Sequence, residues 1–258
     1  MTSAIAVDRS ELEAKVKEMY RQVATAPSGE FHFEMGRGLA ERLGYSAADL
    51  DRVPPEAVES FAGVGFHMDL ADIRAGDELL DLGSGSGMDS FVAALKIRGT
   101  GRVTGLDMTD AQLAKAERLR VHANFTRVSF RKGYIEDLPF QSEAFNVVIS
   151  NGVINLSADK AQVFREVARV LRPDGRLAIS DIVTDKPLPE GATCNATLWA
   201  ACIGGAMQQD AYVAAISAAG LRVRQVRENP RYRFLSQNAT NAAHKYGVKS
   251  VSLVATKA

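Results

Sequence analysis

The stretch LLDLGSGSG, residues 79–87, decides the fold that this sequence predicts. Asp81 closes a short apolar run, and Gly83, Gly85 and Gly87 follow it in a turn that leads into the helical stretch MDSFVAAL. Glycine lets a backbone approach a ligand closely, and a merely tight strand-to-helix turn would need only one or two glycines. Three glycines directly after an acidic residue therefore predict a nucleotide-type site.

The acidic residues around this loop indicate which kind of nucleotide it binds. A dinucleotide fingerprint has the form G-x-G-x-x-G, whereas the third glycine here comes one residue early, and Asp81 would repel a pyrophosphate at the helix N-terminus. An acid at this place suits a cationic ligand. Asp107 ends the run TGLD twenty residues after Gly87, where a carboxylate can accept both ribose hydroxyls. The pattern predicts an adenosine that carries a positive group.

From residue 77 onward, short apolar runs alternate with helical stretches. The runs are DELLDLG, GRVTGLD, VSFRKG, FNVVISN, GRLAISDIV and SVSLVATKA, and stretches such as TDAQLAKAERLRVHA separate the earlier ones. Such repeats form a parallel α/β sheet that binds ligands at the carboxyl ends of its strands. Residues 1–75 look helical, because the apolar positions of DRSELEAKVKEMYRQVA recur at helical spacing. We expect an N-terminal helical cap over 1–75 and a ligand-binding domain over 76–258.

Composition narrows the class of protein further. The chain has 258 residues, 46% hydrophobic and 24% charged, with 31 basic and 31 acidic side chains, which is typical of a soluble enzyme. A balanced charge lacks the basic footprint of nucleic-acid binding, so no nucleic-acid partner is expected. The chain also lacks a secretory leader pattern and a long apolar run, which predicts no membrane association and a cytoplasmic location. Both cysteines are then expected to be free thiols.

The combination of glycine loop and acids resembles the class I S-adenosylmethionine-dependent methyltransferases over residues 76–182. The resemblance implies a doubly wound, mostly parallel, Rossmann-like seven-stranded sheet and S-adenosylmethionine as cofactor. It also implies that Asp81 holds the methionine ammonium through the glycine loop or water. Gly83 and Gly85 would pass close to this ligand, and Asp107 would bind its ribose.

Two further strand ends extend the resemblance. In GYIEDLP, Ile135 would pack on the adenine and Glu136 would accept from its amine, with a solvated loop charge as the alternative for Glu136. In ISNGVINL, Asn151 would line the methionine side, with a simple turn former as the alternative. Gly152 and Val153 would flank the reactive methyl. The cofactor-binding residues expected from the resemblance are Asp81, Gly83, Gly85, Gly87, Asp107, Met108, Ile135, Glu136, Asn151 and Val153.

A longer series of motifs resembles the arsenite methyltransferase family and its bacterial relatives over residues 40–215. The series is AVESFAGVG, LDLGSGSG, VTGLDMT, GYIEDLP, SNGVINL, DKAQVFREVARVLRPDGRL, LPEG and LWAACIGGA. The resemblance implies a trivalent arsenic acceptor held by cysteine thiolates. Cys202 falls on one cysteine of that family, but Gly152 stands where the family form SNCVINL has another. A site of three thiolates cannot therefore be assembled from this one chain.

The other cysteine, Cys194, could complete the site only under one condition. If both cysteines lay on one continuous helix, eight residues would separate their sulfurs by about 12 Å, too far to share one soft ion. They could meet if the helix began after Cys194, with Asn195 or Thr197 as its cap. Three interpretations stay open: Cys194 and Cys202 as a catalytic thiolate pair, Cys202 acting alone, or both as packing residues. The chain shows no closed zinc spacing, so no metal cofactor is expected.

The chemistry of transfer also indicates the acceptor. An arsenic lone pair or a thiolate loses no proton on methylation, whereas oxygen and nitrogen acceptors generally need a base, and SNGVINL offers none. We expect a small-molecule acceptor, with a cellular thiol such as glutathione as a partner. A thiol, carbon or oxygen acceptor, or a binding protein without turnover, is the alternative. In the cap, Tyr20 could line the site, whereas His32 and His67 are expected to be packing or surface residues.

Overall fold

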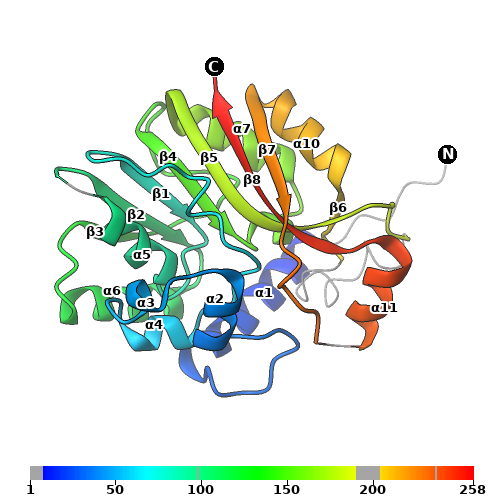
Figure 1. The fold of residues 1–258 in the computed structure, drawn as a ribbon, viewed down its shortest axis with the longest axis horizontal. Helices are drawn as coiled ribbons and strands as arrows, with labels where there is room; N and C mark the ends of the chain where they lie inside the picture. Colours follow the sequence, from blue (N-terminus) through cyan, green and yellow to red (C-terminus); the bar gives the residue numbers. More distant parts are fainter. Residues whose placement is uncertain (1–7, 98, 190–203, 236) are drawn as a thin grey trace.

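The computed structural model describes residues 8–97, 99–189, 204–235 and 237–258, and it shows one central sheet with helices on both faces (Figure 1). The strand order is β3-β2-β1-β4-β5-β8-β7, and every neighbouring pair is parallel except those that β8 makes. The strands are β1 (Glu78–Leu82), β2 (Arg102–Asp107), β3 (Val128–Lys132), β4 (Phe145–Asn151), β5 (Leu171–Thr184), β7 (Leu221–Glu228) and β8 (Lys249–Lys257). The predicted doubly wound, mostly parallel sheet of seven strands is confirmed, with a two-residue eighth strand, β6 (Met207–Gln208), added beside β5.

The topology creates a crevice between β1 and β4. β1 pairs with β2 on one side and with β4 on the other, so the strand order reverses at β1. Ligands of open α/β sheets bind outside the carboxyl ends of the strands at such a reversal. Asp81 and Asn151 lie at the carboxyl ends of these two strands, so the residues that the sequence marked are brought to the crevice.

Alternate residues of the strands face two separate apolar cores. Leu79 packs into a cluster with the cap and α5 (Met88–Lys96), whereas Leu80 packs into a second cluster with α7 (Lys160–Val170) and α10 (Gln209–Ala218). Both residues are fully buried, as the unbroken apolar run of a strand covered on both faces requires. The remaining elements of the domain are α6 (Asp110–His122), α11 (Gln237–Tyr246) and the 3-10 helix η1 (Ile154–Leu156).

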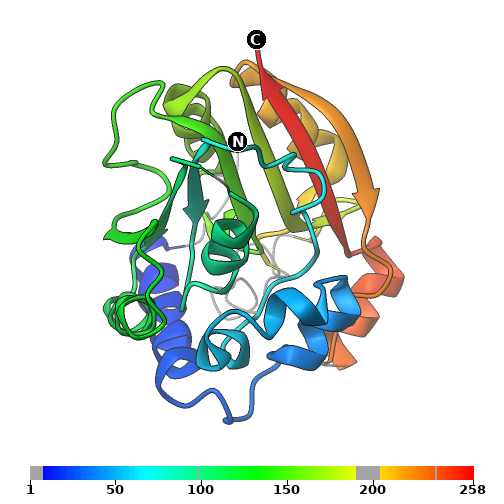
Figure 2. The ribbon, with the colours of Figure 1, turned by 60° about the vertical axis from the view of Figure 1, so that its left-hand side comes forward.

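The described residues up to 75 contain four helices, which we call the cap: α1 (Arg9–Thr25), α2 (Arg37–Leu43), α3 (Ala47–Leu50) and α4 (Pro55–Glu59). Figure 2 shows these blue and light blue helices together at one end of the sheet. α6 holds α1 in place, because Gln112 Nε2 donates to the Tyr20 carbonyl at 2.8 Å and Lys115 Nζ donates to the Ala24 carbonyl at 3.1 Å. None of the described helices is long and apolar enough to cross a membrane.

The loop of residues 63–65 joins the cap to the sheet through buried polar contacts. Asn151 Oδ1 accepts from the backbone N–H of Val64 at 2.8 Å, and Ser250 Oγ donates to the Val64 carbonyl at 2.6 Å. Gly65 leaves no room for a side chain, since a Cβ there would lie 2.2 Å from Asn229 Nδ2 and 2.6 Å from Ser180 Oγ. The loop can therefore lie this close to β5 and β8 only with glycine at position 65.

Gly65→Ala should lower the free energy of unfolding by about 1–3 kcal/mol, because a Cβ without space forces its neighbours to move. Gly38→Ala is the matched control. Gly38 lies in α2 with no atom within 4 Å of its virtual Cβ, so alanine there should stabilise the protein by about 0.5–1 kcal/mol. Urea denaturation measures both values. Equal effects of the two substitutions would contradict the close approach at Gly65.

Candidate functional site

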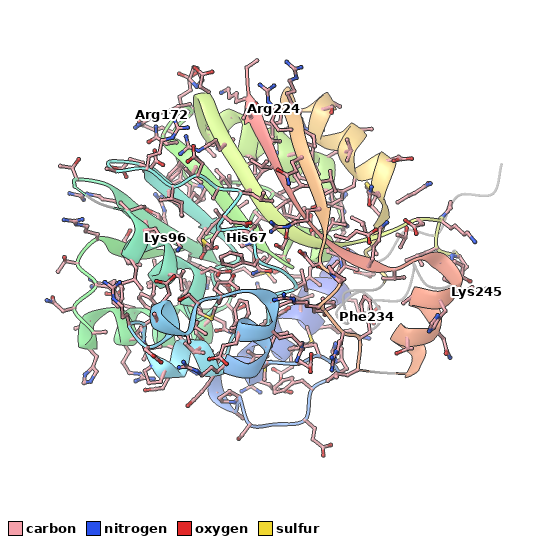
Figure 3. All side chains as sticks on the ribbon, viewed as in Figure 1. His67, Lys96, Arg172, Arg224, Phe234 and Lys245 are labelled. Carbon is pink, nitrogen blue, oxygen red and sulfur yellow. The ribbon has the colours of Figure 1, made fainter. Side chains whose placement is uncertain are left out.

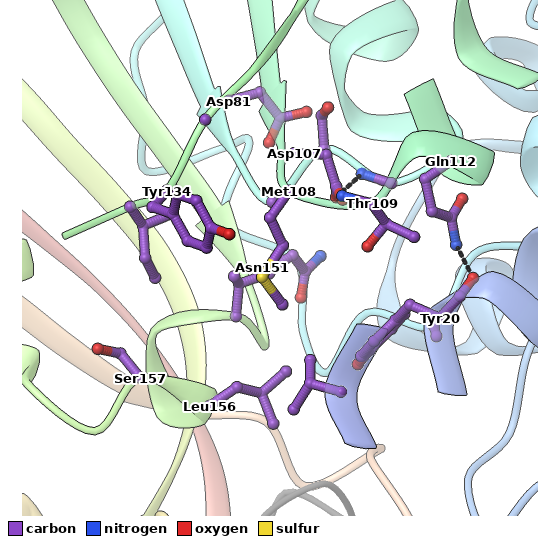
Figure 4. A pocket seen from close by; sticks show the side chains of 18 of the residues that line it. Tyr20, Asp81, Asp107, Met108, Thr109, Gln112, Tyr134, Asn151, Leu156 and Ser157 are labelled. Atoms are coloured by element: carbon purple, nitrogen blue, oxygen red, sulfur yellow. Dashed lines mark hydrogen bonds between the residues drawn. The ribbon is translucent and has the colours of Figure 1, made fainter. Parts of the chain in front are cut away.

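A cavity of about 360 Å³ lies outside the carboxyl ends of β1, β2 and β4 and beneath α1. This volume is within the usual range for small-molecule sites. In Figure 4, Asp81, Asp107, Met108, Asn151 and Tyr20 surround it. The structure brings nine of the ten expected residues to its wall: Asp81, Gly83, Gly85, Asp107, Met108, Ile135, Glu136, Asn151 and Val153.

The glycine loop forms one side of the cavity. Gly85 has φ +52°, a left-handed conformation that side chains rarely adopt, and its virtual Cβ meets no atom nearer than 3.7 Å. Gly83 lies against Val153, which would be 2.4 Å from a Cβ at position 83. Gly87, the tenth expected residue, does not line the cavity. It packs behind the wall, where a Cβ would lie 2.7 Å from Phe130.

Asp107 is oriented by the backbone around it. One carboxylate oxygen accepts from the Gly85 N–H at 2.9 Å and the other from the Thr109 N–H at 2.8 Å. Burial raises the pKa of this carboxyl, while the same backbone hydrogen bonds act to lower it. Each carboxylate oxygen can accept a second hydrogen bond. The orientation of the Asp107 carboxylate is thus fixed by the glycine loop and by the turn after β2.

Asn151 connects the cavity to the cap. Besides accepting from the loop of residues 63–65, its Nδ2 donates to Tyr45 Oη at 3.1 Å and to Asp89 Oδ2 at 3.0 Å. Asp81 lies beside them at the end of β1 and accepts from Ser90 Oγ at 2.6 Å. Burial, and then the charge of Asp89, raise the pKa of Asp81 well above its usual range. Asn151 is therefore a half-buried member of a hydrogen-bond network rather than a simple turn former.

The opposite end of the cavity is built around Glu136. Its carboxylate accepts from Ser157 Oγ at 2.5 Å, and the Ser157 carbonyl accepts from Lys160 Nζ at 2.8 Å. Burial lowers the pKa of Lys160 to about 8, and the charges of Asp181 and Glu136 oppose this shift. Glu136 is therefore held by its surroundings and is not a freely solvated loop charge. Ile135 and Met108 supply apolar surface on the same wall.

The cavity wall is strongly acidic. Among the described residues that line it, Arg9 is the one basic side chain, and Arg9 Nη2 lies 3.7 Å from a carboxylate oxygen of Asp159. The acidic lining residues are Glu13, Asp81, Asp89, Asp107, Glu136 and Asp159. Such a wall favours a cationic ligand and disfavours an anionic one, because like charges in a poorly hydrated site repel each other strongly.

Several lining residues come from elements far away in the sequence. Leu12, Val16 and Tyr20 of α1 cover the cavity, as was expected for Tyr20 alone. Tyr134 also lines the cavity (Figure 4), and its Oη donates to Glu13 Oε1 at 2.8 Å. Sequence reasoning missed Asp89 and the rest of the α1 face. The helical spacing of α1 indicated an apolar face, but its packing partner depended on the tertiary fold.

The histidines of the cap lie away from the cavity wall. His67 is fully buried, its Nδ1 lies 3.3 Å from Ser180 Oγ, and burial lowers its pKa (Figure 3). His32 packs edge-on against Phe33. These histidines are packing residues in the structure, as the sequence indicated.

Arg224 on β7 is exposed at the outside of the sheet and donates to Thr256 (Figure 3).

The acceptor side is described only in part, because Cys194 and Cys202 lie outside the described residues. Gly152, where the related motif has cysteine, has φ +76°, and a Cβ there would lie 3.1 Å from Val64 Cγ1. A side chain at this position would be strained in conformation and tight against the cap loop. The conformation and packing of the loop after β4 therefore favour glycine at position 152.

Comparisons with known proteins agree with this geometry. The family described as "Methyltransferase domain" matches residues 73–220. An arsenite methyltransferase of Halobacterium salinarum is 38% identical over 187 residues, 72% of this chain and 48% of that protein. The human arsenite methyltransferase is 43% identical over 138 residues, 50% of this chain and 37% of that protein. The chain thus spans about half the length or less of these curated relatives.

A solved structure covers more of the chain. The crystal structure of an arsenic (III) S-adenosylmethionine methyltransferase from Chlamydomonas reinhardtii is 31% identical, with a TM-score of 0.69, over 86% of this chain and 74% of that one. Geranyl diphosphate C-methyltransferase from Streptomyces coelicolor has a TM-score of 0.70 at 17% identity, which shows the shared fold alone. Together the family match, the arsenite methyltransferase relatives and the acidic cavity show that this chain belongs to the class I S-adenosylmethionine-dependent methyltransferases of the arsenite methyltransferase type.

Proposed function

We propose that the protein transfers a methyl group from S-adenosylmethionine to trivalent arsenic held by thiolates. The proposal rests on finding two features in one chain. One is an acidic, adenosine-sized cavity, and the other is a sequence that is 38–43% identical to arsenite methyltransferases. The first feature supports the donor, and the second supports the acceptor. Because the chain spans only part of those relatives, the activity is a proposal for this chain as it stands.

The residues of the cavity fit the donor. Asp107 lines the cavity with its carboxylate oriented by the backbone N–H groups of Gly85 and Thr109, and a carboxylate in this position suits the two hydroxyls of a ribose. Ile135 and Met108 offer apolar surface to a base, and the Glu136 carboxylate lies next to Ile135 on the same wall. Six acidic lining residues suit the two positive charges of the donor. When bound, the donor supplies an electrophilic methyl group on a positively charged sulfur.

The chain contributes positioning and water exclusion to the transfer. Leu12, Val16 and Tyr20 cover the cavity with apolar and aromatic surface, and a closed site aligns two reactants and keeps water away. Among the described lining residues there is no histidine or lysine to act as a base. An acceptor that attacks through a lone pair, such as trivalent arsenic, needs none.

Thiolates would hold the arsenic during transfer. Cys202 matches a cysteine of the related family, and Cys194 is the other thiol of the chain, and soft ligands of this kind suit a soft centre. Gly152 supplies no thiolate, so we propose that a cellular thiol such as glutathione completes the coordination. The acceptor then arrives as a small thiol complex.

A second candidate is methyl transfer to an organic thiol, carbon or oxygen acceptor. The observation that favours it is the loop after β4, where Gly152 stands in place of the family's cysteine and has a left-handed conformation that strains any side chain. A relative of this other kind also occurs. A 27-O-demethylrifamycin SV methyltransferase of Amycolatopsis mediterranei is 31% identical over 58% of this chain.

Asp107→Asn should weaken S-adenosylmethionine binding by about 10- to 100-fold. The substitution removes a charged acceptor and turns an amide N–H₂ toward a backbone N–H, and a hydrogen bond to a charged group is worth about 1.5–3 kcal/mol. Isothermal titration calorimetry measures the affinity. Asp110→Asn is the control, because the Asp110 side chain is 81% exposed and should leave the affinity within about twofold. Equal affinities of wild type and Asp107→Asn would show that Asp107 does not contribute to cofactor binding.

The acceptor is tested by S-adenosylhomocysteine formation with arsenite and glutathione. Wild-type protein should turn over, and Cys202→Ser should lose most of the rate, because a hydroxyl does not bind arsenic as a thiolate does. A similar loss in Cys194→Ser would show that both thiols hold the acceptor, whereas an unchanged rate would leave Cys202 alone in that role. Wild-type protein that binds the donor but leaves arsenite unmethylated would rule out arsenic and favour the organic acceptor.

A further inference from the structure

The end of the cavity that holds Asp81 carries a second carboxylate. Asp89 lies in the first turn of α5, is 7% exposed and lines the cavity. Tyr45 Oη donates to one of its oxygens at 2.5 Å, and Asn151 Nδ2 donates to the other at 3.0 Å. Two neutral donors from the cap and from β4 therefore hold the carboxylate of Asp89 in a fixed orientation.

These two carboxylates lack a positive neighbour in the described part of the chain. Asp81 is 2% exposed and bonds to the hydroxyl of Ser90, the residue next to Asp89. Arg9, the basic lining residue, lies beside Asp159 instead. His67 faces this region from the cap loop, but burial lowers its pKa, which favours the neutral imidazole. Two buried acids without a cation are complementary to a ligand that brings one.

We propose that Asp89 is a specificity-determining residue that favours the positively charged methyl donor over the product. This inference rests on the proposed function. In methyl transfer the acceptor's lone pair forms the new bond, and the electrons of the broken carbon–sulfur bond stay on sulfur. The sulfonium of the donor thereby becomes the neutral thioether of S-adenosylhomocysteine. A carboxylate that interacts with the sulfonium charge loses that attraction once transfer is complete, which helps the product to leave.

Substitution of the charge alone tests the proposal. Asp89→Asn keeps the size of the side chain and an oxygen that can accept from Tyr45 or Asn151. Affinities are measured by calorimetry for S-adenosylmethionine, S-adenosylhomocysteine and sinefungin, in which a protonated amine replaces the methylsulfonium. The variant should weaken binding of the two cationic ligands by about 10-fold or more relative to the product, as expected for one charge pair at an intermediate effective dielectric constant.

Tyr45→Phe is the matched control, because it breaks the same hydrogen-bond network and leaves the carboxylate charge in place. It should change the affinities of all three ligands by the same factor. Equal weakening of donor and product in Asp89→Asn would show that Asp89 does not distinguish the sulfonium from the thioether, and it would overturn the inference. Wild-type protein that binds neither nucleoside would overturn the proposed function, and this inference with it.

Wild-type protein provides a second measurement if Asp89→Asn fails to fold. Salt screens attraction between the acidic wall and a charged ligand, although less in a buried site than at a surface. Raising sodium chloride from about 50 to about 500 mM should weaken binding of S-adenosylmethionine and sinefungin by several-fold more than that of S-adenosylhomocysteine. The same salt dependence for all three ligands would overturn the role of charge.

Discussion

The site depends on the hydrogen bonds of the half-buried Asn151 side chain. Its amide oxygen accepts from the cap loop at Val64, and its amide nitrogen donates to Tyr45 and Asp89. One side chain at the end of β4 thus fixes the positions of the cap and of the first turn of α5 relative to the cavity wall. A buried polar network of this kind is favourable only when its members are satisfied, which makes the arrangement specific as well as stable.

Burying the carboxyl groups of the acidic wall costs free energy in the protein without its ligand. Burial and Asp89 raise the pKa of Asp81, and burial raises that of Asp107, so the ionised forms that a cationic ligand needs are disfavoured in the empty cavity. A ligand with positive charge reverses this penalty and stabilises the folded state. Two buried acids with raised pKa therefore coincide with the candidate site, as is expected of functional sites.

The two ends of the cavity differ in how closely they follow the related family. At the donor end, the acids and the glycine loop line the cavity. At the acceptor end, Gly152 adopts a left-handed conformation against Val64, which would strain a side chain at this position. The departure from the related motif therefore lies beside the acceptor, and it leaves two acceptor classes to be separated by experiment.

Local signals in the sequence predicted the strands, the glycine loop and the acids at the strand ends, because the spacing of apolar residues, glycine and charge can be read within one segment. They also indicated an apolar face on α1. The packing of the folded chain places Leu12 and Tyr20 over the cavity, Gly87 behind its wall, and Asp89 in the wall beside Asp81. These facts follow from how helices dock on the sheet and how the cap loop packs at Gly65. Such packing joins residues that are far apart in the chain, and no local pattern encodes it.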